Sequence, residues 1–318
     1  MHKTNTPPVN GSVKTSTIVS ALITACLIML TLLPASMAQA ATSIPVQDLK
    51  TTDIPATYNQ FVLDTTKLKL SSLTFTQGEW LKQDTGGSTY YWPLKIGATA
   101  TISNIGDWED PDGVNHVINA TISLKKWNGG ALGSYKTTGS SFWIFAGDPT
   151  GQSGAGYPSQ VTDALGKVDS SKRIGCQWQL TFTYADGTTV PSTFKGVTGF
   201  NDLDGLDAQP DTPFEGVELV NGFDGAYKTG DAELTGFGVN GFAGFKHDAG
   251  DETNLNGRQQ TKHRLSATWS GSGFTFAYTL AAGSAGNVKT TFGTPIRRLY
   301  PLKYDLNGGT GTGPQQYD

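Results

Sequence analysis

Methionine and cysteine are nearly absent from this sequence of 318 residues. All three methionines lie in the first 37 positions, and Cys176 is the one cysteine after residue 40. A single thiol cannot close an intramolecular disulfide, so the fold must be held by its core. Charged residues make up 16% of the chain, and the helix-favouring Glu and Lys are scarce beside Thr, Gly and Tyr. This composition argues against a helical bundle, and 10% aromatic residues argue against disorder.

Complete catalytic motifs are also missing. The chain has no Gly-x-Ser-x-Gly elbow and no histidine pair with metal-ligand spacing. A glycosidase needs two carboxylates that face one bond, but Glu215 and Glu218 are three positions apart and would face opposite sides of a regular strand. No Glu-x-Asp-x-x-Glu arrangement, the pattern expected of a sandwich glycosidase, is present. We therefore predict that the protein is not an enzyme, and a polysaccharide-active enzyme is the least favoured alternative.

The first 40 residues have the pattern of a secretory signal peptide. Lys3 and Lys14 lie in a polar start without acidic residues, an apolar run extends from about Ile18 to Leu33, and Ala38-Gln39-Ala40 offers a small-x-small cleavage site. The apolar run is shorter than the roughly 20 residues that span a bilayer. We predict a signal peptide over 1–40, cleavage after Ala40, and no membrane span in the mature chain.

Charge narrows the choice of partners. Removal of residues 1–40 takes away two basic residues and no acidic one, which leaves 21 basic against 27 acidic residues and a net charge of −6. Nucleic acids and anionic membranes attract basic proteins, so neither is an expected partner. The sequence predicts a secreted or cell-surface protein.

Alternation of apolar and polar residues recurs along the mature chain, as expected of strands with one buried face. In Cys176–Tyr184, for example, even positions are apolar and odd positions are Gln or Thr. Ten or more such strands, separated by glycine-rich loops, predict an all-β fold: a large antiparallel β-sandwich of jelly-roll type. Only Pro158–Gly166 is expected to form a short helix. We assign residues 41–57 to a leader, 58–296 to the sandwich and 297–318 to a separate tail.

Two segments carry a family resemblance. Tyr304-Asp305-Leu306-Asn307-Gly308-Gly309-Thr310 resembles the first strand and turn of the Listeria–Bacteroides repeat, a small β-grasp spacer module of internalin-type surface proteins. The repeat would be incomplete at residue 318. The blocks Thr181–Gly187, Val197–Gly205 and Glu215–Val217 are similar to the N-terminal β-rich region of large surface proteins of Gram-positive bacteria. These resemblances imply a cell-surface location and an adhesin-like context.

A cluster of acidic residues follows a predicted strand that ends near Phe200. Carboxylates in a glycine-containing loop can converge on Ca²⁺, which takes six to eight oxygen ligands. The alternative is a solvated turn in which Asp and Asn bond to the backbone. The candidate metal ligands are Asp202, Asp204, Asp207, Asp211 and Glu215.

Aromatic residues are the candidate ligand-binding residues. Sugar-binding sandwiches stack exposed aromatic rings on the sugar, and several aromatic residues here lie in short polar or alternating stretches. The alternative is that each ring belongs to the core. The candidates are Trp80, Tyr90, Trp92, Trp108 and Trp127.

The resemblance to Gram-positive adhesins implies two covalent links that this sequence could form. A thioester would use Cys176, whose place on an apolar strand face favours an inert buried thiol instead. An isopeptide bond would use an inward-facing lysine. Lys126 is an even-numbered position like the apolar residues of Ile118–Leu124, so we expect its side chain to point inward as theirs do.

We therefore predict an adhesin-like binding module, whose partner is an extracellular glycan or a host surface protein and whose cofactor, where there is one, is calcium. A structural surface or stalk domain without a ligand is the alternative.

Overall fold

The computed structural model describes residues 42–63, 66–134, 142–150, 156–205, 212–245, 260–284, 287–290, 292–298, 301–302 and 316–317. The predicted signal peptide and the segment that resembles the repeat lie outside these ranges. Within them, no helix has the length and apolar character needed to cross a membrane.

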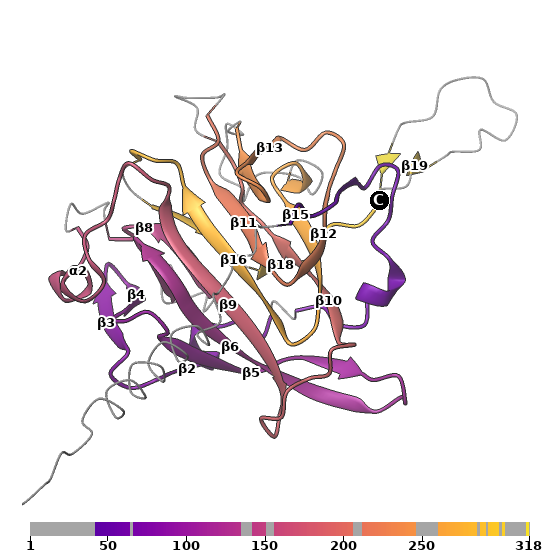
Figure 1. Ribbon diagram of the computed structural model, residues 1–318, viewed down its shortest axis with the longest axis horizontal. Helices are drawn as coiled ribbons and strands as arrows, with labels where there is room; N and C mark the ends of the chain where they lie inside the picture. The colour runs from indigo at the N-terminus through magenta and orange to yellow at the C-terminus, as the bar shows by residue number, and fades with distance from the viewer. Residues whose placement is uncertain are drawn as a thin grey trace, which may run out of the picture. The chain divides into compact units, whose positions relative to one another are not determined.

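Strands dominate the described chain, which confirms the predicted all-β class (Figure 1). The largest sheet has eight strands in the order β13-β14-β11-β16-β9-β6-β5-β2. Its strands are β2 (Leu73–Phe75), β5 (Thr99–Glu109), β6 (Asn115–Asn128), β9 (Ile174–Tyr184), β11 (Gly216–Asn221), β13 (Leu234–Phe237), β14 (Gly241–Gly244) and β16 (Gly273–Leu280).

Two five-stranded sheets accompany it, with the orders β1-β12-β15-β10-β18 and β17-β8-β7-β4-β3. The strands of the first, which we call the β10 sheet, are β1 (Val46–Asp48), β10 (Lys195–Phe200), β12 (Phe223–Lys228), β15 (Leu265–Ser270) and β18 (Phe292–Gly293). The strands of the second, the β4 sheet, are β3 (Trp80–Thr85), β4 (Ser88–Pro93), β7 (Gly130–Ser134), β8 (Trp143–Gly147) and β17 (Asn287–Thr290). The remaining described elements are short. Two strands form an antiparallel pair, β19 (Pro301–Leu302) and β20 (Gln316–Tyr317). There are also two 3₁₀ turns, η1 (Ala56–Tyr58) and η2 (Leu70–Ser72), and one helix.

One continuous core joins the eight-stranded sheet to both five-stranded sheets. On β9, Trp178 and Phe182 are buried while Gln179 and Thr181 between them are half-buried, as the alternating sequence predicts. Phe182 stacks on Trp269 of the β10 sheet with ring centroids 4.6 Å apart. Buried side chains of the β4 sheet belong to the same core. These contacts confirm the predicted large antiparallel sandwich.

Helix α2 (Ser159–Leu165) covers the second face of the β4 sheet. It begins after Pro158, which cannot donate a backbone hydrogen bond, and ends at Gly166, whose φ of 91° lies in the left-handed region. The prediction of a short helix at this place is therefore confirmed. Its Val161 packs on Tyr90 and Trp92 in a second small core.

The N-terminal stretch covers part of the β10 sheet. Strand β1 pairs in parallel with β12, and Leu49 and Ile54 are buried in a third small core. The side chain of Asn240 donates a hydrogen bond to the Thr42 carbonyl and accepts one from the Ile44 amide. Part of the predicted leader, 41–57, thus contacts the sandwich through β1, Leu49 and Ile54.

Candidate functional site

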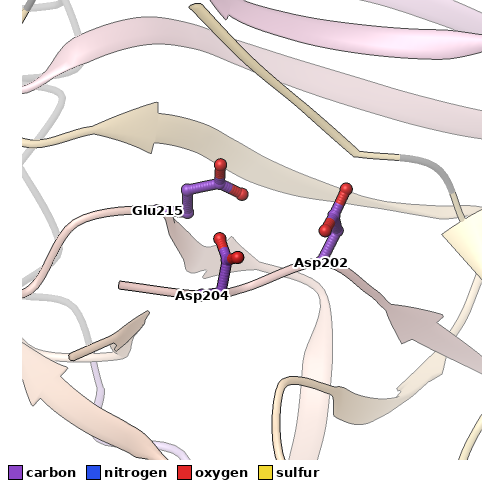
Figure 2. A group of neighbouring side chains, drawn as sticks. All are labelled: Asp202, Asp204 and Glu215. Carbon is purple, nitrogen blue, oxygen red and sulfur yellow. The ribbon is translucent and has the colours of Figure 1, made fainter. Parts of the chain in front are cut away.

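Three acidic side chains converge where the chain passes from one sheet to another. Asp202 and Asp204 follow β10, and Glu215 directly precedes β11 of the eight-stranded sheet. One carboxylate oxygen from each residue lies within 4.8 Å of the others. Figure 2 shows the carboxylates of Asp204 and Glu215 facing each other, with Asp202 beside them. We call these three residues the acidic cluster.

The core dictates how the two aspartates point. Leu203 between them is fully buried, and its amide donates a 3.0 Å hydrogen bond to the His263 carbonyl. Leu203 therefore points into the core, while Asp202 and Asp204 on either side of it are half-buried. Asp202 adopts a φ of 60°, a left-handed conformation that Asp tolerates better than most residues.

Backbone hydrogen bonds hold Glu215 beside Asp204. The Glu215 amide donates to the Asp204 carbonyl at 3.2 Å. Gly244 bonds on both sides of this contact: its amide donates to the Glu215 carbonyl, and its carbonyl accepts from the Phe214 amide, each at 2.9 Å. Backbone bonds among the Asp204 segment, the Phe214–Glu215 segment and strand β14 therefore hold the cluster together.

Tyr278 fixes the Glu215 side chain. Its hydroxyl donates a 3.0 Å hydrogen bond to Oε2 of Glu215, and both residues are buried. Burial raises the pKa of the Tyr278 phenol well above its usual value, and the negative charges of Glu215 and Asp202 raise it further. The phenol consequently acts as a hydrogen-bond donor to the carboxylate.

Arg173 fixes the backbone that leads into Glu215. Its guanidinium donates to the carbonyls of Pro213 and Phe214 and to Oγ1 of Thr279, and it lies 4.3 Å from the ring centroid of Phe237. Desolvation lowers the pKa of Arg173 to about 10, so the group remains charged at neutral pH.

The chemistry of the cluster suits a hard cation. Ca²⁺ prefers carboxylate, carbonyl and water oxygens, and three carboxylates at this spacing can supply half of its usual ligands. Within the described ranges, this is the one group of three or more acidic, histidine or cysteine side chains close enough to hold a metal ion. The structure thus brings together three of the five predicted ligands. Asp207 and Asp211 lie outside the described residues.

The predicted aromatic residues do not form one exposed surface. Tyr90, Trp92 and Trp108 are 3%, 0% and 1% exposed, so their rings belong to the core and offer no face to a ligand. The expectation of an exposed face for Tyr90 and Trp92 fails because helix α2 covers that side of the β4 sheet. Trp80 and Trp127 are half-buried.

Each half-buried tryptophan has aromatic neighbours that the sequence did not single out. Trp80 packs edge-on against Phe75 at 5.1 Å, and Phe75 in turn stacks on Tyr91 at 3.6 Å. Trp127 packs edge-on against Tyr157 at 5.7 Å. Tyr91 is half-buried between the buried Tyr90 and Trp92, and this alternation is the sequence signal that could have separated it from them.

The environments of Cys176 and Lys126 bear on the thioester and the isopeptide bond. Cys176 is buried, its thiol contacts the Gly129 carbonyl, and burial raises the pKa of this thiol far above its usual value. A reactive thiolate is therefore disfavoured. Lys126 is exposed, because β6 has a bulge between Leu124 and Lys126 that reverses the alternation. The inward orientation predicted for Lys126 is wrong.

Several solved structures of bacterial surface proteins align with this chain at low identity. The N-terminal domain of the Streptococcus gordonii adhesin Sgo0707 aligns with a TM-score of 0.48 and 10% identity, over 78% of this chain and 65% of that chain. Glucan Binding Protein C of Streptococcus mutans aligns with a TM-score of 0.38 and 12% identity, over 66% of this chain and 60% of that one. The adhesin domain of PrgB from Enterococcus faecalis, solved bound to DNA, aligns with a TM-score of 0.39 and 9% identity, over 82% of this chain and 88% of that one.

This chain spans less than two thirds of the first two solved chains. No family model matches the sequence, and no curated protein matches it.

Proposed function

We propose that this chain is an adhesin-like binding module of the bacterial cell surface, that it recognises a glycan or a host surface protein, and that Ca²⁺ stabilises it at the acidic cluster. The observation that supports the calcium site is the convergence of Asp202, Asp204 and Glu215 within 4.8 Å. The alternative is a structural surface or stalk domain that binds no ligand.

The burial of the cluster limits its contact with water. Glu215 is 8% exposed, and Asp202 and Asp204 are half-buried. Extracellular calcium is millimolar, so a site with a Kd of roughly 0.1 to 1 mM, typical of extracellular modules, would be occupied.

The calcium proposal is tested by thermal and urea unfolding of the exported chain, from Ala41 to Asp318, in calcium and in chelator. With that Kd, 10 mM Ca²⁺ should stabilise the fold by about 1.4 to 2.7 kcal/mol through mass action. Asp204→Asn and Glu215→Gln should remove most of this gain. Asp186→Asn is the matched control, because Asp186 caps an exposed turn elsewhere, and its gain should equal that of the wild type. Equal stability of the wild type in calcium and in chelator would remove calcium from the proposal.

The binding proposal is tested by glycan-array and host-protein screens of the same chain, with and without chelator. Trp80 and Trp127 are the candidate stacking residues that remain half-buried, and each keeps its indole N–H bonded to a backbone carbonyl. Trp80→Ala and Trp127→Ala are therefore compared with the wild type for any ligand found. Glucan and DNA, named for two of the similar structures, are included as test ligands, and the acidic charge predicts no retention of DNA. Failure to bind any glycan or host protein would favour the structural alternative.

A further inference from the structure

We infer that residues 42–62 form a strap that locks residues 292–297 onto the β10 sheet, so that the two segments open and close together. We call residues 292–297 the exit segment, because the chain leaves the sandwich through them. The inference depends neither on calcium nor on a ligand.

The β10 sheet is buried on both faces. Phe200 and Trp269 belong to the main core that it shares with the eight-stranded sheet. Val197 and Tyr227, on two strands of the same sheet, belong to the third small core instead. The second face therefore needs a cover of its own, and the strap and the exit segment supply it.

The strap is fixed to two strands of this sheet. Strand β1 pairs in parallel with β12, next to the edge of the sheet. Leu49 and Ile54, which follow β1, are 0% and 4% exposed in the third small core. Further along, the Phe61 carbonyl accepts a 3.2 Å hydrogen bond from the Val197 amide of β10.

The exit segment reaches the same small core from the other edge of the sheet. Strand β18 pairs with β10 through two residues, Phe292 and Gly293. The chain then returns over the sheet, where the Ile296 carbonyl accepts a 3.2 Å hydrogen bond from Oγ of Ser266 on the middle strand β15. With only two paired residues, β18 is a weak anchor by itself, so other contacts must hold the exit segment.

The strap supplies these contacts. Ile296 belongs to the same small core as Leu49 and Ile54. The Arg297 guanidinium donates a hydrogen bond to Oδ1 of Asn59 in the strap. Opening of either segment would expose apolar surface that the other helps to bury, and such coupling must act equally in both directions.

The test is amide hydrogen exchange, read by mass spectrometry, on the chain from Ala41 to Asp318. Ile54→Ala should speed exchange in residues 292–297 by about 10-fold or more, and Ile296→Ala should do the same in residues 44–54. Strand β9 should keep the exchange of the wild type in both variants. Val161→Ala is the matched control, because Val161 is buried in the separate small core under helix α2 and should change neither segment.

A surface variant applies if the core variants do not fold. Asn59 is exposed, so Asn59→Ala removes the acceptor of Arg297 without leaving a cavity. Loss of a hydrogen bond of ordinary net strength should speed exchange in both segments by about 3-fold.

Three outcomes would overturn the lock. Faster exchange in the mutated segment alone would show that the strap and the exit segment open independently. Equal acceleration everywhere, β9 included, would show that they open only when the whole fold does. Unchanged exchange of residues 292–297 in Asn59→Ala, where that variant is the one that folds, would show that the strap does not hold them.

Discussion

Gly244 lies so close to Asp204 that a Cβ atom on Gly244 would be 2.4 Å from the Asp204 Cα. Nothing larger than glycine fits there unless the Asp204 segment moves. We predict that Gly244→Ala displaces Asp204 from Glu215, weakens calcium binding and destabilises the fold by about 1 to 3 kcal/mol, as overpacking usually does. Unfolding in calcium and in chelator measures both effects.

Gly236 of the neighbouring strand β13 provides the control. A Cβ at that position would have one contact, at 3.8 Å, so Gly236→Ala should keep the calcium response of the wild type. A full calcium response in Gly244→Ala would contradict the assignment of Gly244 as the support of Asp204.

Sequence alone could identify the acidic residues of the site but not what holds them. Asp202 and Asp204 share a short acidic stretch with Glu215, so composition and spacing point to them. Tyr278 and Arg173 belong to other segments, and only the folded sheet brings Tyr278 to Glu215 and Arg173 to the neighbouring Phe214 carbonyl. The alternation within one strand does not indicate which other strand it pairs with.

Strands with strict alternation could be predicted, whereas glycine-rich strands could not. From the sequence we expect glycine-rich stretches such as 129–130 and 236–244 to be loops, but β7 begins at Gly130 and β14 covers Gly241–Gly244. Their glycines permit close packing: a Cβ on Gly133 would lie 2.7 Å from the Thr89 carbonyl oxygen. A single sequence does not distinguish a glycine needed for close packing from one needed for a turn.

Arg173 should be irreplaceable by lysine. Its planar guanidinium bonds to two successive carbonyls and to Thr279 while it packs on Phe237, whereas a lysine ammonium cannot reproduce this fork. We expect Arg173→Lys to lower the free energy of unfolding by about 2 to 3 kcal/mol, since hydrogen bonds to charged groups are lost in the interior.

Urea denaturation measures this loss, and Lys172→Ala is the control. The Lys172 side chain is 76% exposed and pairs with Asp169 at the surface, so its removal should change stability by less than about 0.5 kcal/mol. Equal effects of the two substitutions would show that Arg173 contributes no more than a surface charge.

The Cys176 thiol should be unreactive in the folded protein. The thiol is 1% exposed and burial raises its pKa, so the reactive thiolate is scarce at neutral pH. We predict no reaction with a thiol-specific reagent in buffer and one equivalent in urea. Intact mass spectrometry should give the mass calculated from the sequence. Formation of a thioester or an isopeptide bond releases ammonia, so a mass 17 Da lower would contradict this prediction.

The turn between β5 and β6 should lose stability in acid. Oδ1 of Asp110 accepts hydrogen bonds from the amides of Asp112 and Val114, and Oδ2 lies 2.9 Å from Nε2 of His116. The bond to His116, followed by the backbone bonds, lowers the pKa of Asp110. A lowered pKa in the folded state means that the unfolded chain takes up the proton first as the pH falls. The contribution of Asp110 is therefore complete above the unfolded value of about 3.9 and is lost as the pH falls through the lower folded value.

Asp110→Asn tests the sign of this effect, because the amide keeps an acceptor for the turn but carries no charge. We expect the wild type to be more stable than Asp110→Asn at pH 6 and the difference to shrink as the pH is lowered below about 4. Urea denaturation between pH 2.5 and 6 measures the difference, and a carboxyl-carbon NMR titration gives the Asp110 pKa directly. A difference that grows toward low pH would mean that the folded state raises the pKa of Asp110, against the geometry of this turn.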